Sequence, residues 1–293
     1  MGYDTGFLGG DPVALPSPSE HVRQQAFCDA QPIHHSRFSV IFHAHRGLAI
    51  CTAHNIDGAT LMSEGVIKRK DRFRFDDQVP TELQIDNDRG YRSNPWDRGH
   101  LTRRRSLHWG SEEEARRADS ESYFWTNIAP QHERLHHTAW GPIENWMLER
   151  AETTDQRAAV FQGPILTPDD PVHTNASDEE PIQIPAGFWK VIVIPHHGRR
   201  TAAAFIVWQR DHDSSYPVSF SPHLEQVRLT TVEFLTGLSF LGLRALDPLR
   251  FDERQVARAA DVEPGRFDRA AGVTRAAVRA HPSAILDPAD IVL

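Results

Sequence analysis

A chain of 293 residues, of which 39% are hydrophobic and 25% charged, falls in the range of globular proteins that bury a sizeable core. No run of about 18 apolar residues is present, which excludes a membrane-spanning helix, and residues 1–18 lack the basic and apolar parts of a signal peptide. The cysteine content, Cys28 and Cys51, excludes a disulfide framework. We therefore expect a cytoplasmic protein without membrane association.

The formal net charge of −8 argues against a protein that coats nucleic acid, because phosphate binding is driven by basic surface and by the release of counterions. An enzyme that acts on nucleic acid needs only a local basic strip. Two such strips occur, at residues 67–74 and at residues 103–105. A charge run by itself usually marks a solvated face, so these strips need support from other residues.

The first third of the chain predicts an arm, a hairpin and a surface segment. Residues 1–36 are rich in proline, glycine and serine, which predicts an extended arm that wraps the domain. Residues 37–44 and 48–53 have the pattern of strands, and residues 45–47 form the turn between them. Residues 68–96 are polar and predict a long segment on the surface.

The middle of the chain predicts two helices separated by a strand. Ser111 begins a capping-box pattern, which predicts a short helix over residues 111–119. Hydrophobic residues recur at helical spacing over residues 138–152, where Pro142 suits the first turn. Residues 123–127, between the two helices, have the aromatic and β-branched content of a strand.

The second half adds strands to a central sheet. Its β-rich runs are residues 158–161, 188–194 and 201–209. Residues 230–236 predict a further helix, which ends at Gly237. Strands and helices follow one another without strict βαβ order, which indicates the α+β class. We expect one domain over residues 37–250, on which a tail over residues 251–293 docks.

The most specific local signal is the tetrapeptide Asp-Arg-Gly-His at residues 97–100. An asparagine, a histidine and a glutamate follow it along the chain, at Asn127, His136 and Glu144. Hydrolysis of a phosphodiester needs a base for water, neutralisation of the phosphate charge and help for the departing oxygen. These side chains together fit that chemistry.

This stretch resembles the DNA/RNA non-specific endonucleases, a family that includes mitochondrial endonuclease G and secreted bacterial nucleases, and whose hallmark is the Asp-Arg-Gly-His motif. The resemblance extends over residues 38–242 and implies the ββα-metal nuclease fold, with a central, mostly antiparallel sheet flanked by helices. Further positions in family order are Tyr91, Leu101–Arg104, Trp109–Gly110, Glu114–Ala115, Phe124–Asn127, Pro130–Gln131, Trp140 and Glu144.

The resemblance implies roles that the chemistry of each side chain supports. His100 is the general base for water, since a neutral imidazole accepts a proton near physiological pH. Arg98 stabilises the charged transition state through paired hydrogen bonds, and Asp97 braces the turn. Asn127 orients the site, and Glu144 binds the metal ion or holds its water. The basic residues expected to contact the substrate are Lys68, Arg69, Lys70, Arg103 and Arg104.

One divalent metal ion, magnesium or manganese, is the implied cofactor. It would stabilise charge on the leaving 3′ oxygen, so the expected products carry a 5′ phosphate. The family has a second asparagine, its direct magnesium ligand, nine residues after the first, where this chain has His136. Imidazole prefers manganese, nickel, cobalt or zinc to magnesium. The expected metal ligands are therefore His136, Asn127 and Glu144, with the identity of the metal open.

Two alternative functions stay open. Residues 132–136, His-Glu-Arg-Leu-His, match the zinc-metalloprotease signature, in which two histidines one helical turn apart bind zinc. That signature must lie in a regular helix, whereas Pro130 and the helix expected from residue 138 favour a loop here. The second alternative is an inactive homologue that binds nucleic acid without cutting it.

The expected partner is nucleic acid, either DNA alone or DNA and RNA. The sequence does not decide between these substrates, because the family contacts phosphates, and phosphate contacts carry no sequence information. A homodimer is expected from the family, and a regulatory protein partner because an uncontrolled nuclease would harm its cell. Outside the site, we expect His54 and Asn55 to end the second strand of the hairpin, and His108 to take no part in the reaction.

Overall fold

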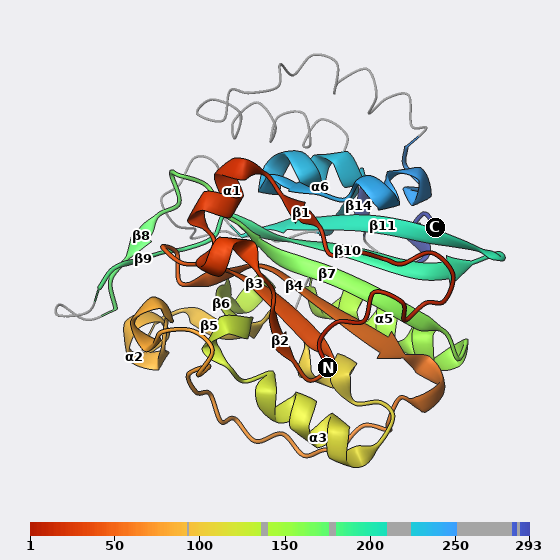
Figure 1. Ribbon diagram of the computed structural model, residues 1–293, viewed down its shortest axis with the longest axis horizontal. Helices are drawn as coiled ribbons and strands as arrows, with labels where there is room; N and C mark the ends of the chain where they lie inside the picture. Colours follow the sequence, from red (N-terminus) through yellow and green to blue (C-terminus); the bar gives the residue numbers. More distant parts are fainter. Residues whose placement is uncertain (93, 136–139, 176–179, 210–223, 251–282, 286–287) are drawn as a thin grey trace.

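The computed structural model describes residues 1–92, 94–135, 140–175, 180–209, 224–250, 283–285 and 288–293. Within these residues an eight-stranded sheet forms the centre of the molecule, in the order β14-β12-β11-β10-β7-β4-β3-β2, and its neighbouring strands are antiparallel (Figure 1). The predicted α+β class is therefore confirmed. The strands of this sheet are β2 Ile33–His35, β3 Phe38–His43, β4 Leu48–Asp57, β7 Arg157–Ile165, β10 Gly187–His196, β11 Arg199–Trp208, β12 Leu224–Val227 and β14 Ser283–Ile285.

Both faces of the sheet are covered. Alternate residues of β10 show this, because Phe188 and Ile192 belong to the core on one face while Trp189 and Val191 belong to the core on the other. A strand buried on both faces reads as a continuous apolar run. The runs predicted over residues 158–161, 188–194 and 201–209 are confirmed as β7, β10 and β11.

Different elements cover the two faces (Figure 1). Helix α5 (Gly141–Thr153) and a small sheet of β5 (Trp96–His100) and β6 (Ile128–His132) contribute to the core of one face. Helix α6 (Leu229–Thr236) and the start of the chain, with Tyr3, contribute to the other. The tetrapeptide with His100 thus lies over the α5 face.

The hairpin of β3 and β4 forms as predicted, with Gly47 in the turn at a φ of 64°. A Cβ at this glycine would also collide with the backbone carbonyl of Leu83. Strand β4 continues to Asp57 because β7 pairs with its second half. His54 and Asn55 therefore lie inside the strand, and the prediction that they end it was wrong.

The first 36 residues are more regular than an extended arm. A helix starts after the N-cap Ser19, and β1 pairs with β13 near the helix α6. Strand β2 already belongs to the central sheet. The elements of this part and its partner are β1 Ser17–Pro18, α1 Glu20–Gln25, the 3-10 helix Phe27–Ala30 and β13 Leu238–Ser239.

Helix α3 (Glu112–Glu121) confirms the capping-box prediction. The Ser111 hydroxyl accepts a hydrogen bond from the Glu114 N–H and donates one to the Glu114 carboxylate. Besides β5, the described residues between β4 and α3 carry the 3-10 helices Gly58–Thr60, Thr81–Leu83 and Arg104–Leu107 and the helix α2 Asn87–Gly90.

The strand predicted over residues 123–127 was wrong, because a 3-10 turn occupies Trp125–Asn127 and β6 starts at Ile128. The Asn127 side chain donates a hydrogen bond to the Ser122 carbonyl at 2.9 Å, which closes this turn. An asparagine that bonds to nearby backbone competes with strand pairing.

The end of the described chain agrees with the predicted helix. Helix α6 ends at Gly237, which has a φ of 66°. Strand β14 pairs with β12, whereas residues 251–282 of the expected tail lie outside the described residues. Among the described residues, no helix has the length and apolar character needed to cross a membrane. The remaining elements are α4 Glu133–Leu135, β8 Val172–His173, β9 Ile182–Gln183 and the 3-10 helices Leu241–Leu246 and Pro288–Asp290.

Candidate active site

The Asp-Arg-Gly-His tetrapeptide lies in β5, which pairs with β6 so that Gly99 is opposite Ala129 and His100 opposite Ile128. A Cβ at Gly99 would overlap the side chain of Gln131, so this position requires a glycine. Asp97 is exposed within the strand, and the prediction that it braces a turn was wrong. The strand pairing aligns the motif with the segment that follows Asn127.

His100 is half-buried against two aromatic rings, with centroid distances of 5.0 Å to Tyr123 and 5.7 Å to Phe73. Its Nε2 is buried and has no hydrogen-bond partner among the residues that the structure describes. Burial, and the positive charges of Arg69 and Arg104, lower the pKa of His100 to about 4. The ring is therefore neutral at pH 7, with a nitrogen atom free to accept a proton.

Arg98 is exposed, two residues before His100 in β5. Its Nη1 donates a hydrogen bond to the Asn87 side chain at 2.6 Å, and its guanidinium lies 5.2 Å from the centre of the Phe73 ring. Asn87 belongs to α2, so this helix and β5 together orient the guanidinium. An exposed, oriented arginine is suited to a phosphate that approaches from solvent.

Asn127 is fully buried, and its amide group bonds to backbone. Its oxygen accepts from the Thr102 N–H at 2.8 Å, and its nitrogen donates to the carbonyls of Thr102 and Ser122 at 3.0 and 2.9 Å. The backbone carbonyl of Asn127 accepts from the Leu101 N–H. These bonds tie the chain directly after His100 to the turn before β6, so Asn127 holds the local backbone in place.

Glu144 lies in the first turn of α5 with only 2% of its surface exposed. Its Oε1 accepts a hydrogen bond of 2.7 Å from the Lys190 Nζ, and its Oε2 is 3.7 Å from the Arg103 Nε. The lysine is 1% exposed and lies 4.4 Å from the centre of the Trp140 ring. Burial lowers the pKa of Lys190, and the charge of Glu144 opposes that change.

The basic strips contribute unequally. Arg104 forms an ion pair with Asp119 at 2.6 Å, and Arg103 donates to the Asn145 side chain at 2.9 Å. Arg69 pairs with Asp71 at 2.7 Å on the surface. Lys68 and Lys70 are exposed. The positive charges of Arg69 and Arg104 both lower the pKa of His100, so one residue of each basic strip lies near the motif.

Lys190 is a residue of the site that the sequence reading missed. The signal was present, because a lysine in the middle of the apolar run Phe188–Ile194 is rare unless it has a partner. Asp119 was missed as well. It accepts from Arg104 and lies 2.7 Å from His108 Nε2, and no sequence pattern marks it.

The expected metal ligands are only partly visible. His136 lies outside the described residues, and no cluster of three or more histidine, cysteine or acidic side chains forms among the residues that are described. Magnesium commonly keeps several waters and binds through one or two carboxylates plus substrate phosphates. The Glu144 carboxylate, whose Oε2 has no partner within hydrogen-bond distance in the described part of the chain, fits such a site.

The described part of residues 132–135 does not favour the zinc-metalloprotease alternative. His132 is the last residue of β6 and is opposite Trp96, and only Glu133–Leu135 is helical after it. A histidine in a strand cannot share the face of a regular helix with a residue four positions later.

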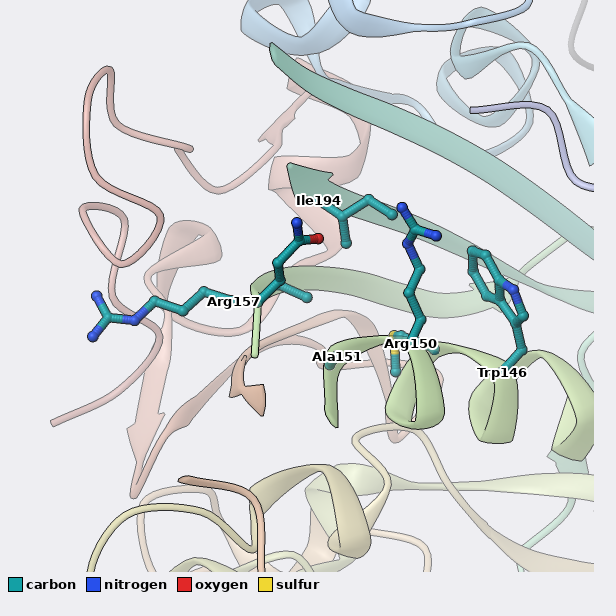
Figure 2. Close-up of a pocket in the computed structure, with 8 residues that line it drawn as sticks. Trp146, Arg150, Ala151, Arg157 and Ile194 are labelled. Atoms are coloured by element: carbon teal, nitrogen blue, oxygen red, sulfur yellow. The ribbon is translucent and has the colours of Figure 1, made fainter. Parts of the chain in front are cut away.

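A small hollow between α5 and the ends of β7 and β10 is separate from the site. Figure 2 shows Trp146 and Arg150 of the helix below Ile194, with the side chain of Arg157 directed away from them. None of the motif residues lines this hollow.

Residues 18–242 match the family model of the DNA/RNA non-specific endonucleases. A protein of Sinorhizobium fredii, described as uncharacterized protein y4fB, is 32% identical over 244 residues, which cover 75% of this chain and 34% of that protein. Human mitochondrial endonuclease G is 25% identical over 182 residues, which cover 59% of this chain and 57% of the relative. Mitochondrial nuclease EXOG of Danio rerio is 25% identical over 199 residues, which cover 64% and 54%. The chain thus spans between a third and somewhat over half of the length of these curated relatives.

Among solved structures, EndoG in its complex with EndoGI resembles this chain with a TM-score of 0.54 at 19% sequence identity, over 77% of this chain and 91% of that one. The expected ββα-metal nuclease fold is thereby confirmed.

Proposed function

Since the chain belongs to the DNA/RNA non-specific endonuclease family, whose members are hydrolases and generally depend on a divalent metal, we propose that it is a metal-dependent endonuclease. The proposed substrate is DNA, with RNA as a second, and cutting is independent of base sequence because contacts to phosphate carry no sequence information. The observation that carries this proposal is the buried Nε2 of His100, which has no hydrogen-bond partner among the described residues, in a ring that is neutral at pH 7.

His100 acts as the general base. Its Nε2 takes a proton from a water molecule as the water oxygen forms a bond to phosphorus. The bond between phosphorus and the 3′ oxygen breaks, and the departing oxygen takes a proton from solvent water, which leaves a 5′ phosphate on one product and a 3′ hydroxyl on the other. Arg98 stabilises the charge on the phosphate oxygens through its guanidinium.

Glu144 is the proposed carboxylate of the metal site, and His136 is the proposed second protein ligand. A bound divalent ion supplies charge stabilisation at the leaving oxygen. Asn127 was expected among the metal ligands too, but its amide oxygen accepts the Thr102 N–H. We therefore propose a positioning role for Asn127. Arg103, Arg104, Arg69, Lys68 and Lys70 are the proposed contacts to the nucleic acid backbone.

The test is a digestion of plasmid, single-stranded DNA and RNA in magnesium, manganese, zinc and nickel. We expect cutting that EDTA abolishes and that His100→Ala reduces strongly, with 5′ phosphates on the product ends. His43→Ala is the matched control, because His43 is also buried and has a pKa lowered to about 4, but it contacts Gln25 and Arg46. A wild-type protein that retains DNA without any products would instead support the inactive nucleic-acid-binding homologue.

A protein partner that controls cutting is a further proposal. It is supported by the solved structure of EndoG, which is a complex with EndoGI described as a mechanism of inhibition. We expect a fraction of an extract from the source cells to change the rate at which the purified chain cuts plasmid. A rate that no fraction raises or lowers would contradict this proposal. The homodimer stays a prediction, which sedimentation equilibrium tests.

A further inference from the structure

Two neighbouring strands of the central sheet, β7 and β10, each carry a side chain that bonds to the site, one next to His100 and one at Glu144. Gln162 of β7 is directly opposite Lys190 of β10, so their side chains lie on the same face of the sheet. Gln162 Nε2 donates a hydrogen bond to the Leu101 carbonyl, directly after His100. Lys190 Nζ donates to Glu144 Oε1 at 2.7 Å. The base and the proposed metal carboxylate are thus both connected to one cross-strand pair.

The lysine sits in surroundings that disfavour a charge. Its same-face neighbours on β10 are Phe188 and Ile192, which belong to the hydrophobic core. Burying two charges costs more in lost hydration than a well-packed apolar pair would, so a buried ion pair is weak evidence for a contribution to stability. The pair of Lys190 and Glu144 therefore needs an explanation other than stability.

The contacts of Glu144 distinguish its two oxygens. Oε1 is bound by the lysine, whereas Oε2 is 3.7 Å from the Arg103 Nε, beyond the length of a hydrogen bond. The aromatic ring of Trp140, 4.4 Å from the lysine Nζ, restricts where the ammonium group can lie. One oxygen is held in a fixed direction, and the other has no hydrogen bond from any residue that the structure describes.

We propose that Lys190 is a positioning residue for the reaction, which holds the Glu144 carboxylate by Oε1 and leaves Oε2 available to the divalent metal ion. This inference rests on the proposed function, because it takes Glu144 as the carboxylate of the metal site. Residues that orient a metal ligand typically change metal affinity or activity by about 10- to 100-fold when they are replaced.

The test compares Lys190→Met, Glu144→Gln and the double variant, each as the full chain. Manganese affinity is measured from the electron paramagnetic resonance signal of free Mn²⁺, melting temperature is measured without metal, and kcat and KM are measured on plasmid. Lys190→Met is expected to lower Mn²⁺ affinity and kcat by about 10- to 100-fold each, with little change in KM for DNA. In the Glu144→Gln background, Lys190→Met should cause no further loss of affinity or kcat.

The melting temperature shows whether Lys190 acts only on stability or also on metal binding and catalysis. Lys190→Met leaves a buried carboxylate without its partner and should melt earlier, whereas the double variant, with both charges removed, should recover much of that loss without recovering Mn²⁺ binding. Arg46→Met is the matched control. The substitution breaks the ion pair between Arg46 and the buried Asp170. The other groups that accept from the Arg46 guanidinium are the backbone carbonyls of residues 167 and 183, away from the site. Arg46→Met should melt earlier and keep wild-type Mn²⁺ affinity and kcat.

Lys190→Met with a lowered melting temperature but wild-type Mn²⁺ affinity and kcat would overturn the positioning role. If Lys190→Met does not fold, Lys190→Leu, which also removes the hydrogen-bond donor, is judged by the same outcomes. Wild-type Mn²⁺ affinity and kcat in Glu144→Gln would overturn the proposed metal carboxylate itself, which is a separate result.

Discussion

Two histidines near the motif, His100 and His108, have opposite surroundings. The ring of His108 is buried with its Nε2 2.7 Å from the Asp119 carboxylate, which also binds Arg104. The ring of His100 packs on Tyr123 and has a buried Nε2 without a hydrogen-bond partner in the described part of the chain. The hydrogen-bonded ring of His108 stabilises the local structure. A buried ring nitrogen without a partner lowers stability, so its presence at His100 indicates a role in function.

The largest expected difference is in kcat, between variants of His100 and variants of His108. His100→Asn is expected to lower kcat on plasmid by about 10²- to 10⁴-fold, because it removes the general base. His108→Asn should leave kcat within about tenfold of wild type, while the loss of its partner at Asp119 costs about 1–3 kcal/mol in the free energy of unfolding. Steady-state kinetics and denaturant unfolding measure the two. Equal losses of kcat in both variants would remove the distinction.

Replacing Arg98, in the strand of His100, should lower kcat more than replacing Arg104, which shares Asp119 with His108. Arg98→Lys is expected to lower kcat by about ten- to a hundredfold, because a lysine cannot form the paired hydrogen bonds to phosphate that a guanidinium forms. Arg104→Lys keeps a charge beside Asp119 and should change kcat less. The comparison is made at saturating plasmid. A greater loss in Arg104→Lys would place the main phosphate contact in the region of His108.

The strand that carries His100 tolerates no side chain at Gly99. Gly99→Ala should lower the free energy of unfolding by about 1–3 kcal/mol, because the new methyl group overlaps Gln131. Gln131→Ala in the same chain should recover part of this loss. Gly242→Ala is the control, since a Cβ there meets no atom within 4 Å. Equal unfolding free energies for Gly99→Ala and the control would show that β5 and β6 are less tightly paired than described.

The smallest effect concerns pH. A base acts in its neutral form, and the pKa of His100 is lowered to about 4, so kcat/KM should stay nearly constant as the pH falls from 7 to about 5 and decline only below that. Arg69→Gln removes one charge that lowers this pKa, so the decline should move to higher pH by under about one unit. Initial rates across pH, with circular dichroism to confirm folding, measure both. A wild-type decline centred near pH 6.5 would contradict the described burial of His100.

Local patterns in the sequence were enough to predict the hairpin around Gly47, the helix that Ser111 caps, and the long strands of the second half. The hairpin and the helix depend on residues close together in the chain, a turn glycine and a side chain that caps a helix. The strands were predicted from their continuous apolar runs, which a strand buried on both faces needs. The tetrapeptide at residues 97–100 was identified together with Asn127, His136 and Glu144 further along the chain, and its role in phosphodiester chemistry was implied by the resemblance to the endonuclease family.

What the tertiary structure decided depends on residues far apart in the chain. The length of β4, and so the place of His54, follows from its pairing with β7, more than a hundred residues later. The partner of Glu144 is Lys190, on a strand that only folding brings beside α5. Whether a polar side chain is paired or free is set by burial and by neighbours across the sheet, and these are properties that spacing along one chain does not contain.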